Sequence, residues 1–472
     1  MRKVALHNLG CKVNSYELDV IGQKLEEKGF TIVPFDEQAD VYVINTCTVT
    51  NIADRKSRQM LHQAKKRNPN AVVVAAGCYV QTGKEQVLMD AGIDLAVGNN
   101  RKKDLADILE AYIADKEGAG CFSKTMNDTS VIDINATFDY EDMQLKHTAE
   151  HTRAYIKVQD GCNQFCSYCI IPFARGRVRS RHLDSIRKEI TGLAAAGYKE
   201  IVLTGIHISS YGIDFEDDAW ALGMCVDKPQ SSDRHDYSGS SKLLDLIERI
   251  HDIPGIERIR IGSLEPRIVN SESAERLARL PKLCPHFHLS LQSGCDATLK
   301  RMNRKYTAAQ FKESVQALRE AFDAPAITTD VIVGFPGESE EEFQQTVQYL
   351  EDLSLYEMHI FKYSVRKGTV AATMKGQVPE AVKSKRSAVL LEMEARKSKE
   401  YRGRFVGKCV KVLFEEQKEI HGEVYMVGHT AEYVKVAFKT KEDFSNQIAE
   451  IMVQDYLADD ILLGSLYKVL EI

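Results

Sequence analysis

The stretch Gly161-Cys162-Asn163-Gln164-Phe165-Cys166-Ser167-Tyr168-Cys169 brings three thiols close together in the chain. We interpret these thiols as ligands of one iron-sulfur cluster. Thiolates are the usual protein ligands of such clusters, and three of them leave one iron of a four-iron, four-sulfur cube open for substrate. The alternatives are a structural zinc site, which needs a fourth Cys or His where only His182 lies close, and a chance group of core cysteines.

Six apolar runs around and after this stretch are typical of buried β-strands, and helical patterns separate them. The runs are 155–158, 201–203, 258–261, 287–291, 327–333 and 358–363. This alternation predicts a partial (β/α)6 barrel over residues 151–378. Polar or Gly-rich segments follow the strands, at the rim where barrel enzymes keep their active sites.

The N-terminal residues 1–116 show a second alternation of strand and helix, which predicts a doubly wound parallel sheet in an α/β multidomain chain. Its apolar runs, 4–9, 41–44 and 71–76, are each followed almost at once by a cysteine, namely Cys11, Cys47 and Cys78. The carboxyl ends of parallel strands share one edge of the sheet, so these thiols should converge into a second three-thiolate site. The alternative is that small cysteines simply fill strand ends.

The C-terminal residues 403–472 hold five short strand-like runs, which predict a small β-barrel of the kind that often binds oligonucleotides. An unspecialised stability domain is the alternative. Residues 379–402 form a charged helical pattern with an apolar stripe, so we expect a connector helix. Residues 117–150 predict a linker, and 213–240, rich in Asp and Ser, predict a surface insertion without assigned chemistry.

Composition predicts a water-soluble chain. At 472 residues, about three domains are expected, and no apolar run reaches the length of a membrane span. Eleven cysteines in so long a chain do not form a disulfide framework and suit a reducing compartment, so we expect a cytoplasmic monomer. The net charge of −6 requires any nucleic-acid contact to come from local patches.

Arginines close to the cysteine stretch are the candidates for such a patch. Arg175, Arg177 and Arg179 follow the three thiols, and Arg301 and Arg304 follow the fourth barrel strand. Arginine is a common ligand of phosphate groups, so we predict contacts with RNA or with a cofactor. The alternative is an ordinary solvated loop.

The spacing Cys-x3-Cys-x2-Cys with Tyr168 before the last cysteine resembles the signature of the radical S-adenosylmethionine enzymes. The resemblance implies that Cys162, Cys166 and Cys169 hold a 4Fe-4S cluster and that Tyr168 packs near the adenine of S-adenosylmethionine. It implies further contacts along the rim: Thr204 and Gly205 near the methionyl group, Ser263 and Glu265 near the amino group or ribose, Gln292 and Asp330 near the ribose, and Gly334 to Gly337 near the adenine. The family's common Gly-Gly-Glu after the second strand is absent.

Two three-thiolate sites and a small barrel together resemble the methylthiotransferases. The segments 9–14 and 45–50, Leu-Gly-Cys-Lys-Val-Asn and Asn-Thr-Cys-Thr-Val-Thr, look most like the branch that acts on threonylcarbamoyladenosine in tRNA. In that family a second 4Fe-4S cluster, here on Cys11, Cys47 and Cys78, takes part in sulfur insertion at carbon 2 of the adenine, next to the anticodon. S-adenosylmethionine is both radical source and methyl donor.

The same resemblance implies partners. The C-terminal barrel looks like the TRAM domain, an RNA-binding appendage of tRNA-modifying enzymes, and a flavodoxin-like or ferredoxin-like reductase would supply electrons. Within the family, the alternatives are methylthiolation of isopentenyladenosine in tRNA or of an aspartate in a ribosomal protein. From another class, the chain could be a non-catalytic iron-sulfur RNA-binding regulator.

Overall fold

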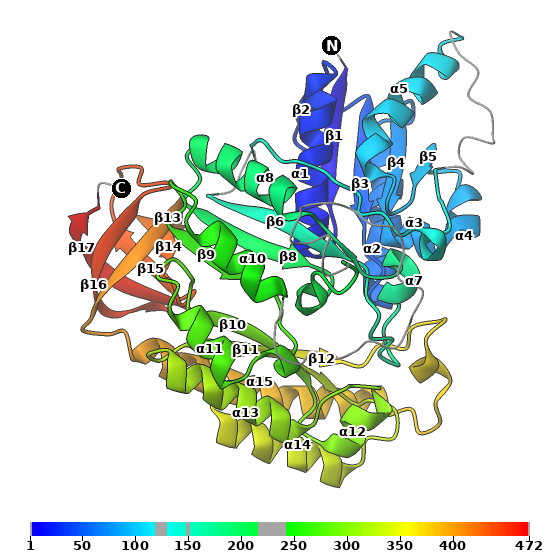
Figure 1. Cartoon of the computed structure of the whole chain (residues 1–472). Helices are drawn as coiled ribbons and strands as arrows, with labels where there is room; N and C mark the ends of the chain where they lie inside the picture. The colour runs from blue at the N-terminus through cyan, green and yellow to red at the C-terminus, as the bar shows by residue number, and fades with distance from the viewer. Residues whose placement is uncertain (1, 119–129, 148–151, 216–241, 471–472) are drawn as a thin grey trace.

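The computed structural model describes residues 2–118, 130–147, 152–215 and 242–470. These residues form an N-terminal α/β unit, a central unit and a C-terminal barrel (Figure 1). Most of the predicted insertion at 213–240, and residues 119–129 and 148–150 of the predicted linker at 117–150, lie outside the described residues. In the described part of the chain, no helix has the length and apolar character to cross a membrane.

The N-terminal unit is a five-stranded parallel sheet with the order β2-β1-β3-β4-β5, which confirms the predicted doubly wound fold. The three predicted strands are β1 (Lys3–Asn8), β3 (Val41–Thr46) and β4 (Val72–Gly77), and two three-residue edge strands, β2 (Thr31–Val33) and β5 (Leu95–Val97), complete the sheet. The helices are α1 (Lys12–Glu27), α2 (Asn51–Arg67), α3 (Cys78–Thr82), α4 (Lys84–Leu88) and α5 (Leu105–Lys116).

The central unit has the six parallel strands that the sequence predicts for a partial barrel. They are β6 (Arg153–Asp160), β8 (Glu200–Gly205), β9 (Arg258–Ile261), β10 (His286–Gln292), β11 (Ala326–Val333) and β12 (Glu357–Lys362). Only isolated bridges join the β9 segment to the β10 segment, and β7 (Arg179–Ser180) adds an antiparallel pair beside β6. The helices are α7 (Ile171–Arg175), α8 (Leu183–Ala195), α10 (Lys242–His251), α11 (Ser271–Ala278), α12 (Asp296–Arg301), α13 (Ala308–Ala321) and α14 (Glu340–Leu353).

The two faces of these strands differ in chemistry because successive side chains of a strand point to opposite faces. One face joins the hydrophobic core shared with the surrounding helices and includes Ile156, Leu203, Ile261, Leu289 and Val331. The other face is polar and includes Arg153, Glu200, Arg260, His288 and Asp330. An interior face of this kind is built to bind polar groups rather than to fill a core.

The C-terminal unit follows the predicted connector helix α15 (Glu380–Gly403) and is a closed barrel, as expected. Its strands are β13 (Cys409–Ile420), β14 (Glu423–His429), β15 (Lys435–Lys439), β16 (Ile448–Ala458) and β17 (Ile461–Val469). The loop between β14 and β15 docks on the amino ends of the central strands: Arg258 donates to the His429 carbonyl at 2.9 Å and Arg260 to the Ala431 carbonyl at 2.9 Å.

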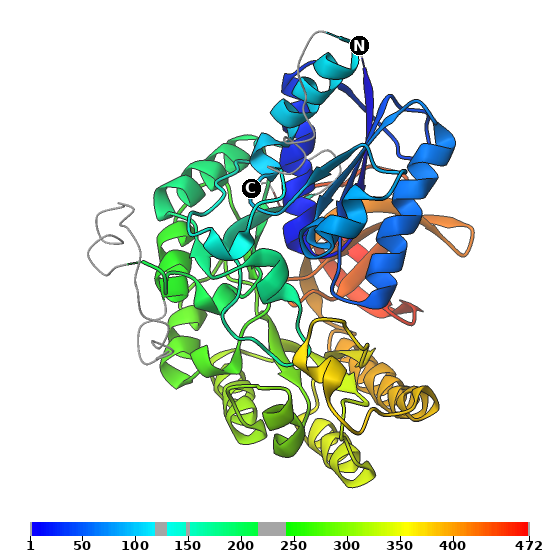
Figure 2. The ribbon, with the colours of Figure 1, turned by 90° about the vertical axis from the view of Figure 1, so that its right-hand side faces the viewer.

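Helix α1 joins the N-terminal unit to the central unit. Its Glu17 carboxylate lies 2.8 Å from the Lys157 ammonium on β6, and its Tyr16 hydroxyl donates to Glu189 on α8 at 2.9 Å. In Figures 1 and 2 the N-terminal unit (blue) lies at one end of the central unit and helices α13, α14 and α15 at the other. The carboxyl end of β4 lies close to helix α7, which follows β6 in the chain, because Arg175 donates to the sulfur of Cys78.

Candidate functional site

The loop with Cys162, Cys166 and Cys169 begins where β6 ends. Its conformation is fixed by the segment after α12: the Ser167 amide donates to the Met302 carbonyl at 3.0 Å, and the Asn303 side-chain amide donates to the Phe165 carbonyl at 2.8 Å. The three thiols face one another closely enough for their charges to interact. The structure thus brings the predicted ligand set together on a well-anchored loop.

Gly161 allows this loop to leave the strand. Its φ is +72°, and a β-carbon at this position would lie 1.8 Å from the Arg177 carbonyl oxygen. Only glycine adopts this conformation without strain and tolerates so close an approach of two backbone segments. Cys162, the next residue, is held by a hydrogen bond from its amide to the Gly176 carbonyl at 3.0 Å.

The second group of thiols lies at the edge of the N-terminal sheet, as predicted. Cys11 precedes α1, Cys47 follows β3, and Cys78 begins α3 directly after β4. Each thiol feels the charge of the others, and a β-carbon on Gly10 would lie 3.2 Å from the Cys47 sulfur. Cys47 and Cys78 are buried, whereas Cys11 is exposed at the edge.

The environment of both groups disfavours deprotonated thiols that have no cation bound to them. Burial is the largest cause, and together with the neighbouring thiols it raises the pKa of Cys47 to about 11 and that of Cys169 to about 12. Bound metal would supply the positive charge that keeps such thiols deprotonated. Three thiols in each group are the ligand number that leaves one iron of a 4Fe-4S cluster open.

Arg175 lies against the second thiol group. It is fully buried, its Nε donates to the Cys78 sulfur at 3.3 Å, and its Nη2 donates to the Asn14 side-chain carbonyl at 2.6 Å. Its Nη1 lies 2.5 Å from Glu17 and 3.2 Å from Asp160. The side chain therefore ties the second thiol group to the interface between the two units.

The predicted RNA contacts of Arg175 and Arg179 are wrong, because both side chains are buried away from solvent. Arg179 pairs with Asp160 at 3.8 Å and donates to the Arg175 carbonyl at 2.9 Å. Arg304 is also directed inward, with Nη1 3.2 Å from the Cys166 sulfur and Nη2 on Glu265. Arg177 is exposed over the Phe165 ring, and Arg301 is partly exposed in an ion pair with Glu342.

The residues expected near the adenine lie together beside the first thiol group. Tyr168 meets the ring of Phe335 edge to face at 6.3 Å, and Phe335 lies between Gly334 and Gly337 of the loop after β11. Tyr363 packs on Phe335 at 5.3 Å, and its buried hydroxyl has no hydrogen-bond partner among the described residues. These packed rings and the Tyr363 hydroxyl are groups that a heteroaromatic ring with polar edges contacts.

The residues expected near the amino group and ribose occupy the same rim. Glu265 is buried between Arg304 and His207; although burial disfavours its carboxylate, these partners lower the pKa of Glu265 to about 2. Gln292 ends β10 with a φ of +72°. Ser263 is exposed, and Asp330 lies on the polar face of β11.

Thr204 and Gly205, the residues expected near the methionyl group, end β8. Thr204 is buried, and Gly205 packs closely against Gln159 of the adjacent strand. They lie at the carboxyl end of β8, which pairs with β6, and β6 leads into the first thiol group. Their position therefore suits the predicted contact with the methionyl group.

Sequence reasoning named Arg304 and Arg175 but not their contacts with cysteine sulfurs, and it missed Asn99 altogether. Arg304 donates to Cys166, while Arg175 and Asn99 donate to Cys78, the amide at 3.5 Å. Arginines near the thiols were visible in the sequence, but nothing in it separated buried from exposed ones. Asn99 follows the three-residue strand β5 and carried no signal.

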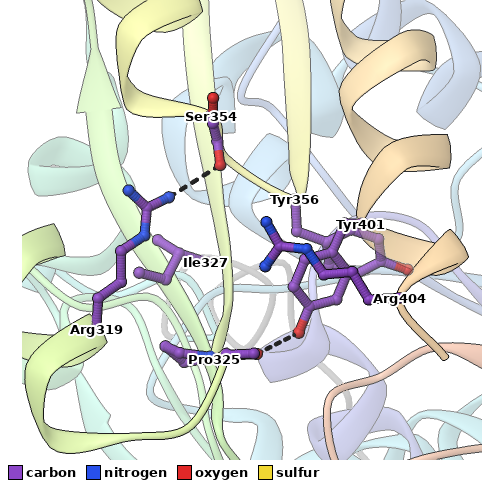
Figure 3. A pocket seen from close by; sticks show the side chains of 8 residues that line it. Arg319, Pro325, Ile327, Ser354, Tyr356, Tyr401 and Arg404 are labelled. Atoms are coloured by element: carbon purple, nitrogen blue, oxygen red, sulfur yellow. Dashed lines mark hydrogen bonds between the residues drawn. The ribbon is translucent and has the colours of Figure 1, made fainter. Parts of the chain in front are cut away.

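A separate cavity of about 340 Å³ lies at the opposite end of the barrel strands. It is lined by Arg319, Ala324, Pro325, Ile327, Ser354, Tyr356, Tyr401 and Arg404 (Figure 3). Tyr401 donates to the Ala324 carbonyl at 2.7 Å, and Arg319 donates to the Ser354 carbonyl at 2.9 Å. Because Pro325 and Tyr356 precede β11 and β12, this cavity is at the amino ends of the strands and not at the thiol-bearing rim.

Comparisons with known proteins match both thiol-bearing units to families. Residues 156–350 match the radical SAM superfamily, and residues 3–98 match Uncharacterized protein family UPF0004. Among solved structures, the radical S-adenosylmethionine methyltransferase TsrM from Kitasatospora setae aligns with a TM-score of 0.55 at 17% identity, over 79% of this chain and 77% of that one. At this identity the likeness concerns the fold alone.

Two curated relatives extend the match over nearly the whole chain. The threonylcarbamoyladenosine tRNA methylthiotransferase MtaB of Bacillus subtilis (strain 168) is 39% identical over 454 residues, which cover 96% of this chain and 94% of the relative. The tRNA-2-methylthio-N(6)-dimethylallyladenosine synthase of Acetivibrio thermocellus is 31% identical and covers 95% of this chain and 88% of the relative. The chain therefore belongs to the radical S-adenosylmethionine family of tRNA methylthiotransferases.

Proposed function

We propose that this protein attaches a methylthio group to carbon 2 of N6-threonylcarbamoyladenosine, next to the anticodon of tRNA. The observation that carries the proposal is the pair of separate three-thiol groups at adjoining edges of the N-terminal and central units. The higher identity to the relative named for threonylcarbamoyladenosine, 39% against 31%, favours this nucleoside over dimethylallyladenosine.

The two thiol groups have different roles in this proposal. Cys162, Cys166 and Cys169 hold one 4Fe-4S cluster beside the rim that binds S-adenosylmethionine, and Cys11, Cys47 and Cys78 hold the other. When bound, these groups supply the one-electron chemistry, the sulfur and the methyl group that replacement of an unreactive adenine C–H bond requires.

The chain's own residues position these reactants. Arg304 and Arg175 donate hydrogen bonds to Cys166 and Cys78, which stabilises negative charge on the two sulfurs. Tyr168, Phe335 and Tyr363 form an aromatic cluster against which the adenine of S-adenosylmethionine packs. Glu265 stays ionised against Arg304 and offers an anionic partner for the amino group.

The polar face of the barrel supports a charged nucleoside side chain. Lys12 follows the thiol of Cys11, is accessible to solvent, and has Arg260, Arg153 and Glu200 as its electrostatic neighbours. A threonylcarbamoyl group carries a carboxylate that an ammonium group binds. A dimethylallyl group would instead need an apolar pocket.

Several aspects of the proposal follow from the chemistry rather than from geometry. Radical formation needs an external electron, so we infer a flavodoxin-like or ferredoxin-like reductase as partner. A tRNA substrate and reduced thiols imply a cytoplasmic enzyme, and we expect it to act as a monomer. Arg177 and Arg301, which reach the surface, remain proposed RNA contacts.

The decisive experiment replaces Cys11, Cys47 and Cys78 together with alanine in anaerobically reconstituted protein. Iron should fall from roughly eight to roughly four atoms per chain. The variant should still cleave S-adenosylmethionine to 5′-deoxyadenosine and methionine, yet form no methylthio product on threonylcarbamoyladenosine in tRNA, as judged by mass spectrometry.

A matched control replaces Cys284 and Cys295, which are buried cysteines outside both groups, with alanine. This control should keep its iron and its product, because it loses packing alone. Product formation by a well-folded triple variant would refute the second cluster. A product on dimethylallyladenosine alone would shift the assignment to the sibling reaction, and the absence of any cleavage by wild-type enzyme would favour the non-catalytic regulator.

A further inference from the structure

Three potential metal ligands from three neighbouring strands meet on the polar face of the central barrel. His288 is on β10, Asp330 on β11 and His359 on β12. In the sheet, Thr328 is the partner of His288, and His359 is the partner of Asp330. One ligand atom from each of the three residues lies within 4.8 Å of the other two.

The strand register and a neighbouring hydroxyl orient the first of these ligands. The Nδ1 atom of His288 is 2.9 Å from the Thr328 hydroxyl, so its Nε2 is the atom that faces Asp330, at 3.4 Å from Oδ2. Such a hydrogen bond on the second ring nitrogen is the usual way in which proteins fix a metal-binding imidazole. The ring of His359 stacks on that of His288, with centroids 5.7 Å apart and an angle of 23°.

We propose that His288, Asp330 and His359 bind one divalent transition-metal ion, with Zn²⁺ or Fe²⁺ as the best-suited candidates. Imidazole and carboxylate are ligands that these ions prefer, and two histidines with one carboxylate leave further coordination positions open. Bonds of about 2.0–2.2 Å require the ligand atoms to approach somewhat closer than in the metal-free arrangement. The exposed side chain of His359 has the freedom to make this adjustment.

The site is chemically distinct from both thiol groups. It offers nitrogen and oxygen ligands within 4.8 Å of one another, whereas both thiol groups offer sulfur ligands alone. The family resemblance predicted that Asp330 contacts the ribose of S-adenosylmethionine, but its carboxylate faces His288. This geometry assigns Asp330 to the ion.

An ion at this position would add a function to the polar face. Its open coordination positions accept carboxylate oxygens, so it would anchor the carboxylate of the threonylcarbamoyl group. This use of the ion rests on the proposed function, whereas ion binding itself does not. The two statements can therefore fail separately.

The test measures metal content in the enzyme with both iron-sulfur clusters in place, so that the cysteines are already occupied. The protein is equilibrated anaerobically with ZnSO4 and desalted, and zinc and iron are measured together by plasma mass spectrometry. We expect about one zinc per chain with unchanged iron. His288→Ala and His359→Ala should each weaken zinc binding at least about tenfold and leave the iron unchanged.

His62→Ala is the matched control, because His62 also lies against a carboxylate, 2.8 Å from Asp90, and is not part of a three-ligand group within the described residues. It should bind zinc as the wild type does. Wild-type zinc levels in both His288→Ala and His359→Ala, or equal loss in His62→Ala, would overturn the site. Zinc binding without methylthiolation would support the metal site and refute the proposed function. Methylthiolation by an enzyme that binds no zinc would refute the metal site and support the proposed function.

Discussion

Buried arginines connect the chemistry of the thiol groups to the fold. Arg175 fills the space between Cys78, Asn14 and the carboxylates of Glu17 and Asp160. Burial of a guanidinium is costly, but the two carboxylates more than offset it and raise the pKa of Arg175 well above its ordinary value. The side chain is therefore a fixed positive charge beside a cysteine, and its loss leaves two buried carboxylates short of a partner.

Arg175→Gln should lower the stability of the protein by about 3–5 kcal/mol, the usual result of breaking a buried ion pair on one side. Thermal unfolding followed by circular dichroism measures the change. Arg177→Gln is the matched control, two residues away and exposed, and should change stability by no more than about 0.5 kcal/mol. Equal effects of the two substitutions would contradict the ion-pair network.

Gly161→Ala should disrupt the loop of the first thiol group, because the new methyl group would collide with the Arg177 carbonyl oxygen. We expect roughly half of the reconstituted iron to be lost and cleavage of S-adenosylmethionine to fail. Gly197→Ala is the control: its φ is also positive, +94°, but no atom lies within 4 Å of the new β-carbon. It should cost only about 1–2 kcal/mol and keep the iron.

At the scale of elements, the loop between β14 and β15 is held by charges at the amino ends of the barrel strands. Glu200 on β8 lies 3.0 Å from Arg260 on β9, and Arg153 on β6 pairs with Glu415 of β13. The ring of Tyr433 lies under the guanidinium groups of Arg153 and Arg260, at 4.9 and 4.7 Å. The C-terminal barrel thus closes the amino ends of the central strands, opposite the rim that carries Cys162, Cys166 and Cys169.

His429 should make this junction sensitive to pH. Burial lowers the pKa of His429, and Glu415, which accepts from its Nδ1 at 2.6 Å, offsets this only in part. The unfolded chain therefore takes up a proton before the folded one as the pH falls below about 6.5, and stability declines by up to about 1.4 kcal/mol per pH unit.

Thermal midpoints of the wild type and of His429→Gln, compared between pH 7.5 and 5.5, measure this contribution. The wild type should lose more stability over this range than the variant, because the variant has no imidazole to protonate. Other groups that titrate are common to both proteins and cancel in the comparison. Equal losses of stability in the two proteins between pH 7.5 and 5.5 would show that His429 is not held neutral.

The success of sequence reasoning also varied by element. Long buried runs such as β4 and β11 were predictable, because a strand buried on both faces or packed against helices needs continuous or alternating apolar residues. Strands β2 and β5, of three residues each, are too short to show a period. The convergence of Cys11, Cys47 and Cys78 was predictable from parallel-sheet geometry, whereas the burial of Arg175 depends on how α1 packs on β6 and has no local signature.

At the scale of the whole molecule, the C-terminal barrel has a structural role in addition to its proposed RNA-binding role. Its removal would uncover Arg258 and Arg260, whose guanidinium groups donate to carbonyls of the β14–β15 loop. A truncation from about residue 407 would therefore weaken the central unit as well as tRNA binding, and it could not separate the two roles. A surface substitution on the barrel can separate them.

Tyr467 on β17 is the residue for this test. Tyr467 is 69% exposed, so β17 presents an aromatic ring to solvent on the surface of the barrel. Bases stack on exposed aromatic rings with about 1–3 kcal/mol per base. Tyr467→Ala should weaken tRNA binding roughly 5- to 150-fold, and Tyr467→Phe, which keeps the ring, should restore it.

Cleavage of S-adenosylmethionine in the absence of tRNA should be the same in the wild type and in both Tyr467 variants, because the ring contacts neither the thiols nor the core. Filter binding or fluorescence anisotropy with tRNA that carries threonylcarbamoyladenosine gives the affinities, and the salt dependence of binding should stay nearly constant because no charge is removed. Unchanged affinity in Tyr467→Ala would place the RNA-binding surface on another face of the molecule. A loss of cleavage together with binding would show that the outer face of β17 supports the fold, since a contact made only with RNA has no effect when RNA is absent.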